Sequence, residues 1–166
     1  GKVRLPVDMN KIASLHEVTL RMEHVKIRYG SRTILKDLDW EIKNGEKWAL
    51  FGPNGAGKST LLSLVYADNP QSYANTLYLF DRKRGSGESI WDIKKRIGYV
   101  SPEMHLYYKE NVPTLNIVGS GFFDSIGLFR KCNAEQETVA LEWMKVFGIE
   151  HLKDRLFLTL SSGEQR

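Results

Sequence analysis

A glycine-rich stretch at residues 51–60 restricts the possible folds of this chain more than any other feature. Its sequence, FGPNGAGKST, fits the pattern G-x-x-x-x-G-K-[ST]. Gly52, Gly55 and Gly57 allow positive φ and close approach of the backbone to a ligand, because glycine has no Cβ. Successive N–H groups then form an anion-binding nest at the positive end of the following helix. The pattern predicts a phosphate-binding loop made by Gly52, Pro53, Asn54, Gly55, Ala56, Gly57, Lys58, Ser59 and Thr60.

The chemistry expected of this loop is nucleotide binding with a divalent cation. Lys58 is expected to bridge the β- and γ-phosphates as a point charge, which makes it the candidate catalytic residue. The Ser59 hydroxyl is expected to ligate Mg²⁺. The flanks support this interpretation over an ordinary turn, because residues 47–51 form a short apolar run typical of a buried strand. Residues 61–66 are typical of a buried helix.

The stretch LSSGEQR at residues 160–166 permits two compatible interpretations. Ser161 or Ser162 can cap a helix, with Glu164 near its third position. The same stretch resembles the LSGGQ signature of the ABC (ATP-binding cassette) ATPases, which also opens a helix. That resemblance implies ATP as the nucleotide. It also implies that Ser161, Ser162, Gly163 and Glu164 contact the γ-phosphate bound to a partner cassette.

Two further residues take roles from the same resemblance. Residues 25–29 resemble the strand that ends in an adenine-stacking aromatic, which makes Tyr29 the candidate for ATP stacking. Plain strand packing is the alternative, because Val25, Ile27 and Tyr29 alternate onto one face. Residues 97–101 resemble the strand before the Q-loop, but Pro102 and Glu103 stand where a glutamine is expected. Glu103 is a candidate Mg²⁺ ligand or, equally, a solvated loop charge.

A closer resemblance rests on residues 79–95, 45–48 and 123–127. These segments look like the second cassette of a bacterial family of tandem ABC ATPases named for molybdenum transport and photorepair. The similarity runs from about Val25 to Arg166. No residue in it indicates binding of molybdate or DNA.

The resemblance implies an α/β P-loop NTPase core with an antiparallel β subdomain and a helical subdomain. We expect a linker at residues 1–18, the nucleotide-binding core at 19–103 and the helical subdomain at 104–166. The Walker B strand, catalytic glutamate and switch histidine of the family would follow Arg166. The chain is therefore expected to be an incomplete cassette that does not turn ATP over by itself.

Local patterns predict the individual elements. Alternation at residues 19–29 and 38–42 indicates antiparallel strands, and Asn44 and Gly45 mark a turn after them. Residues 76–80 and 97–101 are expected to form further strands. Residues 89–96 and 114–120 are expected to be helical. Asn133 and Gln136 form a capping-box pattern for a further helix that ends at Gly148. Its predicted apolar stripe is Val139, Trp143, Val146 and Phe147.

Composition limits the remaining classes of function. Hydrophobic residues make up 42% and charged residues 27%, and no run is long enough to span a membrane. The single cysteine, Cys132, excludes an intramolecular disulfide, and we expect a cytoplasmic location, with the inner face of the membrane as a second candidate. Basic runs at residues 82–84 and 94–96 have acidic neighbours such as Asp81, Glu88 and Asp92. This mixture favours a solvated face over a nucleic-acid site.

Two classes of function stay open at this point. One is an ATPase that pairs with a second cassette, in tandem or as a homodimer, with a membrane permease as a candidate partner. Such an ATPase can couple hydrolysis to transport or can act as a soluble, non-transport ATPase. The other is a nucleotide-dependent switch with little turnover, which Glu164 and the absent Q-loop glutamine favour, since Glu164 brings negative charge towards a γ-phosphate.

Overall fold

The computed structural model describes residues 4–6, 16–66, 69–123 and 130–166. The chain divides into one compact unit within residues 14–99 and another that contains residues 100–166. None of the helices described is long and apolar enough to cross a membrane.

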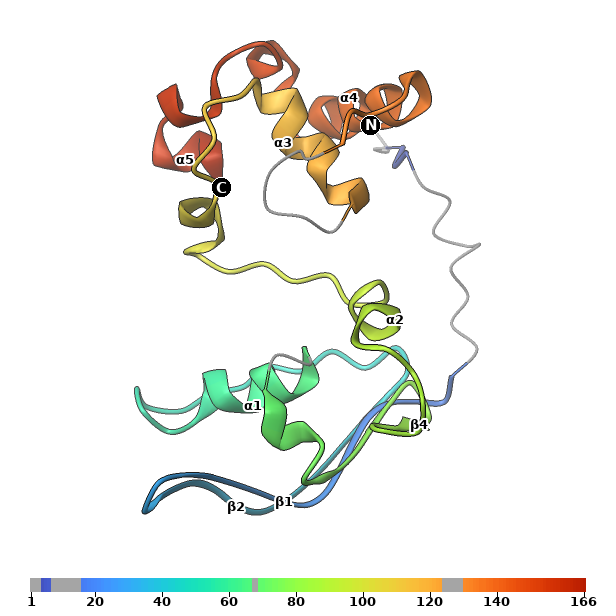
Figure 1. Cartoon of the computed structure of the whole chain (residues 1–166), viewed down its shortest axis with the longest axis vertical. Helices are drawn as coiled ribbons and strands as arrows, with labels where there is room; N and C mark the ends of the chain where they lie inside the picture. The colour runs from blue at the N-terminus through green and yellow to red at the C-terminus, as the bar shows by residue number, and fades with distance from the viewer. Residues whose placement is uncertain (1–3, 7–15, 67–68, 124–129) are drawn as a thin grey trace. The chain divides into compact units, whose positions relative to one another are not determined.

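The unit of residues 14–99 is built on a four-stranded antiparallel sheet in the order β2-β1-β3-β4 (Figure 1). Its strands are β1 (Val18–Tyr29), β2 (Arg32–Lys43), β3 (Thr76–Leu79) and β4 (Arg82–Lys83). The strands predicted at residues 19–29, 38–42 and 76–80 are therefore confirmed, and so is the antiparallel type predicted for the first two. The predicted turn at Asn44 and Gly45 is also present, with Gly45 at a φ of +83°.

A β-bulge at His24 changes which residues of β1 face the core. His24 has a φ of +50°, and the register with β2 shifts between Met22 and Val25. A bulge adds one residue to a strand, so the alternation of faces moves by one position. Leu20 and Met22 are buried before it, and Val25 and Ile27 after it.

One hydrophobic core joins this sheet to the helix that follows the glycine-rich loop. Helix α1 (Lys58–Val65) contributes Leu61 and Leu64, which are 6% and 1% exposed. Burying a leucine side chain stabilises a fold by about 1.5–3 kcal/mol. These two side chains therefore anchor α1, and with it the loop at its N-terminus, against the sheet. The buried members of this core are Leu20, Met22, Val25, Ile27, Leu61, Leu64, Leu77, Leu79 and Ile93.

Two short helices complete this unit. The 3₁₀ helix η2 (Pro70–Ser72) follows α1 in the described chain. Helix α2 (Ile90–Lys94) begins after Ser89, whose hydroxyl and the Asp92 carboxylate form a capping box. The helix predicted at residues 89–96 is thus confirmed in type and is shorter at its C-terminal end.

The unit that contains residues 100–166 is helical. Helix α3 (Thr114–Ser120) confirms the helix predicted at residues 114–120, and α4 (Ala134–Val146) begins with the predicted capping box of Asn133 and Gln136. Gly148 follows α4 with a φ of +71°, as the C-terminal signal predicts. The remaining elements are α5 (Ser162–Gln165) and the 3₁₀ helices η3 (Met104–Tyr107), η4 (Gly121–Phe123), η5 (Glu150–Leu152) and η6 (Phe157–Thr159).

The predicted apolar stripe of α4 is only partly buried, because Val139, Trp143 and Val146 are half-buried. Ala140 and Met144 are the buried residues of this helix, whereas Phe147 is 71% exposed. Trp143 and Phe147 instead stack on each other, with ring centroids 6.2 Å apart. This contact covers part of the apolar surface of both rings, which the sequence pattern had assigned to the core.

The strands predicted at residues 47–51 and 97–101 are also wrong. Neither segment is a strand, and Phe51 and Val100 are 88% and 91% exposed. A buried strand requires a pairing partner along its edges, and no described strand pairs with either segment. Trp48 packs instead edge-on against Trp40 of β2, and its indole N–H donates to Glu46.

Candidate nucleotide-binding site

The glycine-rich loop leads directly into α1 through two residues in the left-handed conformation. Gly55 has a φ of +82°, and Gly57, the N-cap of α1, has a φ of +98°. A Cβ at Gly57 would lie 2.8 Å from Cγ2 of Ile34 in β2, which is closer than side chains allow. Position 57 therefore requires glycine for both its backbone angle and its space. The prediction of positive φ is wrong for Gly52, because Gly52 is outside the positive-φ region.

The Lys58 side chain folds back over the loop that precedes it. Its ammonium donates to the carbonyl oxygens of Gly52 and Pro53, the second at 2.7 Å. These bonds hold a positive charge inside the loop, where phosphate oxygens can compete for it with stronger, charge-assisted bonds.

The first turn of α1 adds further donors beside this ammonium. The N–H groups of Lys58, Ser59 and Thr60 have no carbonyl acceptor within their own helix, because they lie in its first turn. No acidic residue occupies that turn, so the positive end of the helix is not neutralised locally. The loop and the helix start together can bind an anion with several charges.

An open hollow of about 340 Å³ lies over this loop. That volume is in the range of small-molecule binding sites. It brings together most of the predicted loop residues with Tyr29, and it adds two residues that the sequence analysis missed, Arg32 and Ile34. Tyr29 and Arg32 face each other across the tight turn between β1 and β2. The lining residues are Tyr29, Arg32, Ile34, Asn54, Gly55, Gly57, Lys58, Ser59 and Thr60.

Tyr29 stands at the end of β1 and is half exposed, at 51%. Val25 and Ile27 on the same strand are fully buried, so Tyr29 does not share their packing in the core. Its phenolic oxygen accepts a hydrogen bond from the Asn69 amide at 3.0 Å. An exposed ring at the rim of the hollow is available to a ligand, and its role in stacking adenine stays a prediction.

Ser59 and Glu103 are the two candidate Mg²⁺ ligands. Ser59 is exposed and lines the hollow, whereas Glu103 is an exposed residue of the unit that contains residues 100–166. No group of three or more His, Cys, Asp or Glu side chains that could hold a metal occurs among the described residues. Mg²⁺ commonly binds through one or two protein ligands together with substrate phosphates, and Ser59 fits that arrangement. Both ligand assignments stay predictions.

Ser161 caps helix α5, as one interpretation of residues 160–166 predicts. Its N–H and its hydroxyl donate to the Glu164 carboxylate at 2.8 and 2.9 Å, and its hydroxyl oxygen accepts from the Glu164 N–H. The backbone N–H of Ser161, followed by its hydroxyl, lowers the pKa of Glu164. The capping prediction is confirmed, and the contact of Ser161, Ser162, Gly163 and Glu164 with a partner's ATP stays a prediction.

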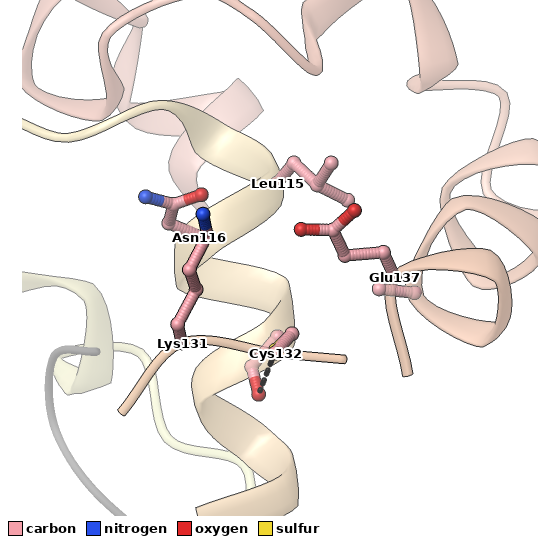
Figure 2. Close-up of a pocket in the computed structure, with 7 residues that line it drawn as sticks. Leu115, Asn116, Lys131, Cys132 and Glu137 are labelled. Carbon is pink, nitrogen blue, oxygen red and sulfur yellow. Dashed lines mark hydrogen bonds between the residues drawn. The ribbon is translucent and has the colours of Figure 1, made fainter. Parts of the chain in front are cut away.

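A smaller cavity of about 80 Å³ lies between α3 and α4 (Figure 2). Its wall includes Cys132, whose thiol donates to the Gly119 carbonyl at 3.7 Å. Burial, and then the charge of Glu137, raise the pKa of this thiol, so it stays protonated and weakly reactive. A nucleotide needs several times this volume.

The chain resembles known proteins over most of its length. Residues 35–166 match the protein family described as ABC transporter. The ABC transporter ATP-binding protein ModF of Escherichia coli is 50% identical over 141 residues, which cover 84% of this chain and 29% of that protein. An uncharacterized ABC transporter ATP-binding protein of Schizosaccharomyces pombe, C323.04, is 30% identical over 99% of this chain and 34% of its own length. The chain thus spans about a third of these curated relatives.

Solved structures agree in fold. CbiO1 from Clostridium perfringens, part of the ABC transporter complex cbiONQ, superposes with a TM-score of 0.68 at 25% identity, over 90% of this chain and 58% of that one. The ATP-binding cassette MJ0796, described as a dimer bound to ADP and Pi, gives a TM-score of 0.67 at 23% identity, over 88% and 65% of the two chains. The α/β P-loop NTPase fold predicted from the sequence is confirmed.

Proposed function

The chain belongs to the ABC transporter family of ATP-binding cassettes, and on that premise we propose that it binds ATP and Mg²⁺ in the hollow over the glycine-rich loop. The observation that carries the proposal is the meeting of Tyr29, Lys58 and Ser59 around one open hollow. Lys58 and the first-turn N–H groups bind the phosphates, and Ser59 ligates Mg²⁺. Tyr29 stacks on the adenine.

Hydrolysis by the whole protein is the second part of this proposal. A second cassette, in tandem or in a homodimer, places its signature residues opposite the Lys58 loop, and the present Ser161, Ser162, Gly163 and Glu164 do the same for the partner's ATP. The dimer described for MJ0796 with ADP and Pi supports this arrangement. We place the protein in the cytoplasm, at the inner face of the membrane if it serves a permease.

We expect the whole protein to release phosphate from ATP in a Mg²⁺-dependent reaction. Phosphoryl transfer depends on positioning and on neutralising the developing charge, and the metal supplies much of that charge. Chelation of Mg²⁺ should therefore reduce phosphate release to background, and added Mg²⁺ should restore it. Faster phosphate release in the presence of membranes would favour a role in transport. Equal rates with and without membranes would favour a soluble, non-transport ATPase. Release that persists without the metal would contradict the proposed site.

A nucleotide-dependent switch is the second candidate, and one contact favours it. The Ser161 hydroxyl donates to the Glu164 carboxylate, so this hydroxyl already has an acceptor and a negative charge beside it. That charge opposes the approach of a γ-phosphate. Tight ATP binding by the whole protein without phosphate release would select this candidate over the ATPase.

Replacing Tyr29 with alanine should weaken ATP binding by about 1–3 kcal/mol, since that is the usual contribution of stacking between a base and an aromatic ring. Replacing it with tryptophan should retain binding, because the larger ring also presents a flat face. Titration of the whole protein with ATP measures both effects. Equal affinities for the alanine and tryptophan variants would show that Tyr29 does not stack on the base.

A further inference from the structure

A chain of hydrogen bonds joins the Tyr29 side chain to the helix that carries the phosphate-binding loop. Asn69, which is 5% exposed, donates from its amide nitrogen to the Tyr29 phenolic oxygen at 3.0 Å and to Ser63 Oγ at 3.2 Å. Ser63 Oγ in turn donates to the carbonyl oxygen of Thr60 at 2.6 Å. The chain thus runs from the rim of the hollow to the last residue of the loop.

The Asn69 side chain is fixed by its other bond. Its Oδ1 accepts from the Gln71 N–H at 3.0 Å, which caps the 3₁₀ helix η2. Both ends of the amide are therefore engaged, and the direction of the donor towards Tyr29 is set by the fold. A buried amide with its donors and acceptor satisfied is rigid, which suits it for orienting a neighbour.

Two neighbouring amides attach the same segment to β1 without contacting the tyrosine side chain. Gln71 exchanges two hydrogen bonds with the backbone of Arg28, and Asn75 exchanges two with the backbone of Lys26. Asn69 differs because its amide bonds to the side chain of Tyr29. Asn69 therefore positions the tyrosine ring, whereas Gln71 and Asn75 hold the backbone of β1.

The ring needs such a bond because little else restrains it. Tyr29 lies at the end of its strand and is half exposed, so the core does not hold its side chain. An exposed aromatic side chain loses rotamer freedom when it stacks on a ligand, and this loss opposes binding. A hydrogen bond at the far end of the ring removes part of that freedom before the ligand arrives.

We propose that Asn69 is a positioning residue that holds the Tyr29 ring for stacking on the adenine of ATP and ties its position to the phosphate-binding loop through Ser63 and Thr60. This proposal rests on the function proposed above, because it assumes that the nucleotide lies between Tyr29 and Lys58. Asn69 does not touch the nucleotide and acts only through the tyrosine.

The test compares a ligand that has a base with one that lacks it. MgATP and inorganic triphosphate with Mg²⁺ are titrated calorimetrically into the whole protein and into the variants Asn69→Ser, Tyr29→Phe and the double variant. Serine keeps the helix cap but is too short to reach Tyr29. Each single variant should bind ATP about 2- to 10-fold more weakly, the range for one neutral hydrogen bond, and should bind triphosphate as the wild type does. The double variant should be no weaker than Asn69→Ser.

Asn75→Ser is the matched control, because it removes amide bonds from the same segment to the same strand and should leave ATP affinity unchanged. Equal weakening of ATP and triphosphate in Asn69→Ser would overturn the proposal, since Asn69 would then maintain the loop and not the ring. The proposal would also be overturned if the losses of ATP affinity in the two single variants multiplied in the double variant. If the wild-type protein binds triphosphate and MgATP with equal affinity, the proposed role of Tyr29 itself is refuted. If it binds neither ligand, the nucleotide site is refuted.

Discussion

Replacement of Lys58 by alanine is expected to weaken MgATP binding about 10- to 150-fold, which corresponds to the roughly 1.5–3 kcal/mol of a charge-assisted hydrogen bond. The ammonium now bonds to the carbonyl oxygens of Gly52 and Pro53, so it already lies inside the loop. A phosphate needs only to displace these two neutral acceptors. Titration of the whole protein with a fluorescent ATP analogue measures the change.

Lys47→Ala provides the control for this experiment. Lys47 is an exposed lysine in the segment that leads to the loop, and it does not line the hollow. Its removal changes the net charge by the same amount and should leave ATP affinity within about twofold of the wild type, as expected for an exposed charge. Unchanged affinity in Lys58→Ala, or equal losses in both variants, would refute the role of Lys58.

The second large effect is expected at a buried ion pair between Arg84, which follows β4, and Glu88. The Arg84 and Glu88 side chains are 0% and 6% exposed, and Arg84 Nη1 lies 3.8 Å from Glu88 Oε1. Arg84 also donates to the Tyr73 hydroxyl at 3.2 Å, whereas its Nε and Nη1 have no hydrogen-bond acceptor among the described residues. Glu88→Ala leaves the guanidinium charge without compensation and should destabilise the fold by about 3–5 kcal/mol.

Chemical denaturation of the whole protein measures this loss, and two variants locate its cause. The double variant Arg84→Met, Glu88→Leu replaces both charges with apolar groups and should recover most of the stability. Ser86→Ala removes only the 2.8 Å hydrogen bond from Ser86 to Glu88 and should cost about 0.5–1.5 kcal/mol. A stability of Glu88→Ala within about 1 kcal/mol of the wild type would show that the pair is not the stabilising contact.

Arg84 also shows where sequence patterns are misleading. It belongs to a basic run at residues 82–84, yet its side chain is buried and does not contribute to an exposed basic surface. The sequence could not predict this burial, because it depends on Tyr73 and Glu88 folding around the guanidinium.

Elements governed by local interactions were predictable from the sequence. The capping boxes at Asn133 and Ser161 and the helix end at Gly148 involve residues within a few positions of one another. The glycine-rich loop followed the same rule, because its Gly55 and Gly57 adopt the expected left-handed angles before α1. The residues of the loop itself were therefore accessible from a short pattern, and the fold class followed from the family resemblance that this pattern shares with residues 160–166.

Features that depend on distant partners were not predictable. The apolar run at residues 47–51 suggested a strand, but strand formation requires a paired edge that the run itself does not encode. The bulge at His24 depends on its pairing with β2, where the Asp39 carboxylate accepts the His24 N–H. Arg32 and Ile34 line the hollow only because the β1–β2 turn returns them to Tyr29.

The most direct test of the nucleotide site is a structure of the whole protein determined with MgATP or a non-hydrolysable analogue. We expect phosphate oxygens against the N–H groups of residues 55–59, with the Lys58 ammonium moved from the Gly52 and Pro53 carbonyls to the phosphates. We also expect the adenine ring against Tyr29. A nucleotide bound elsewhere, or bound while Lys58 keeps both carbonyl contacts, would contradict the proposed site.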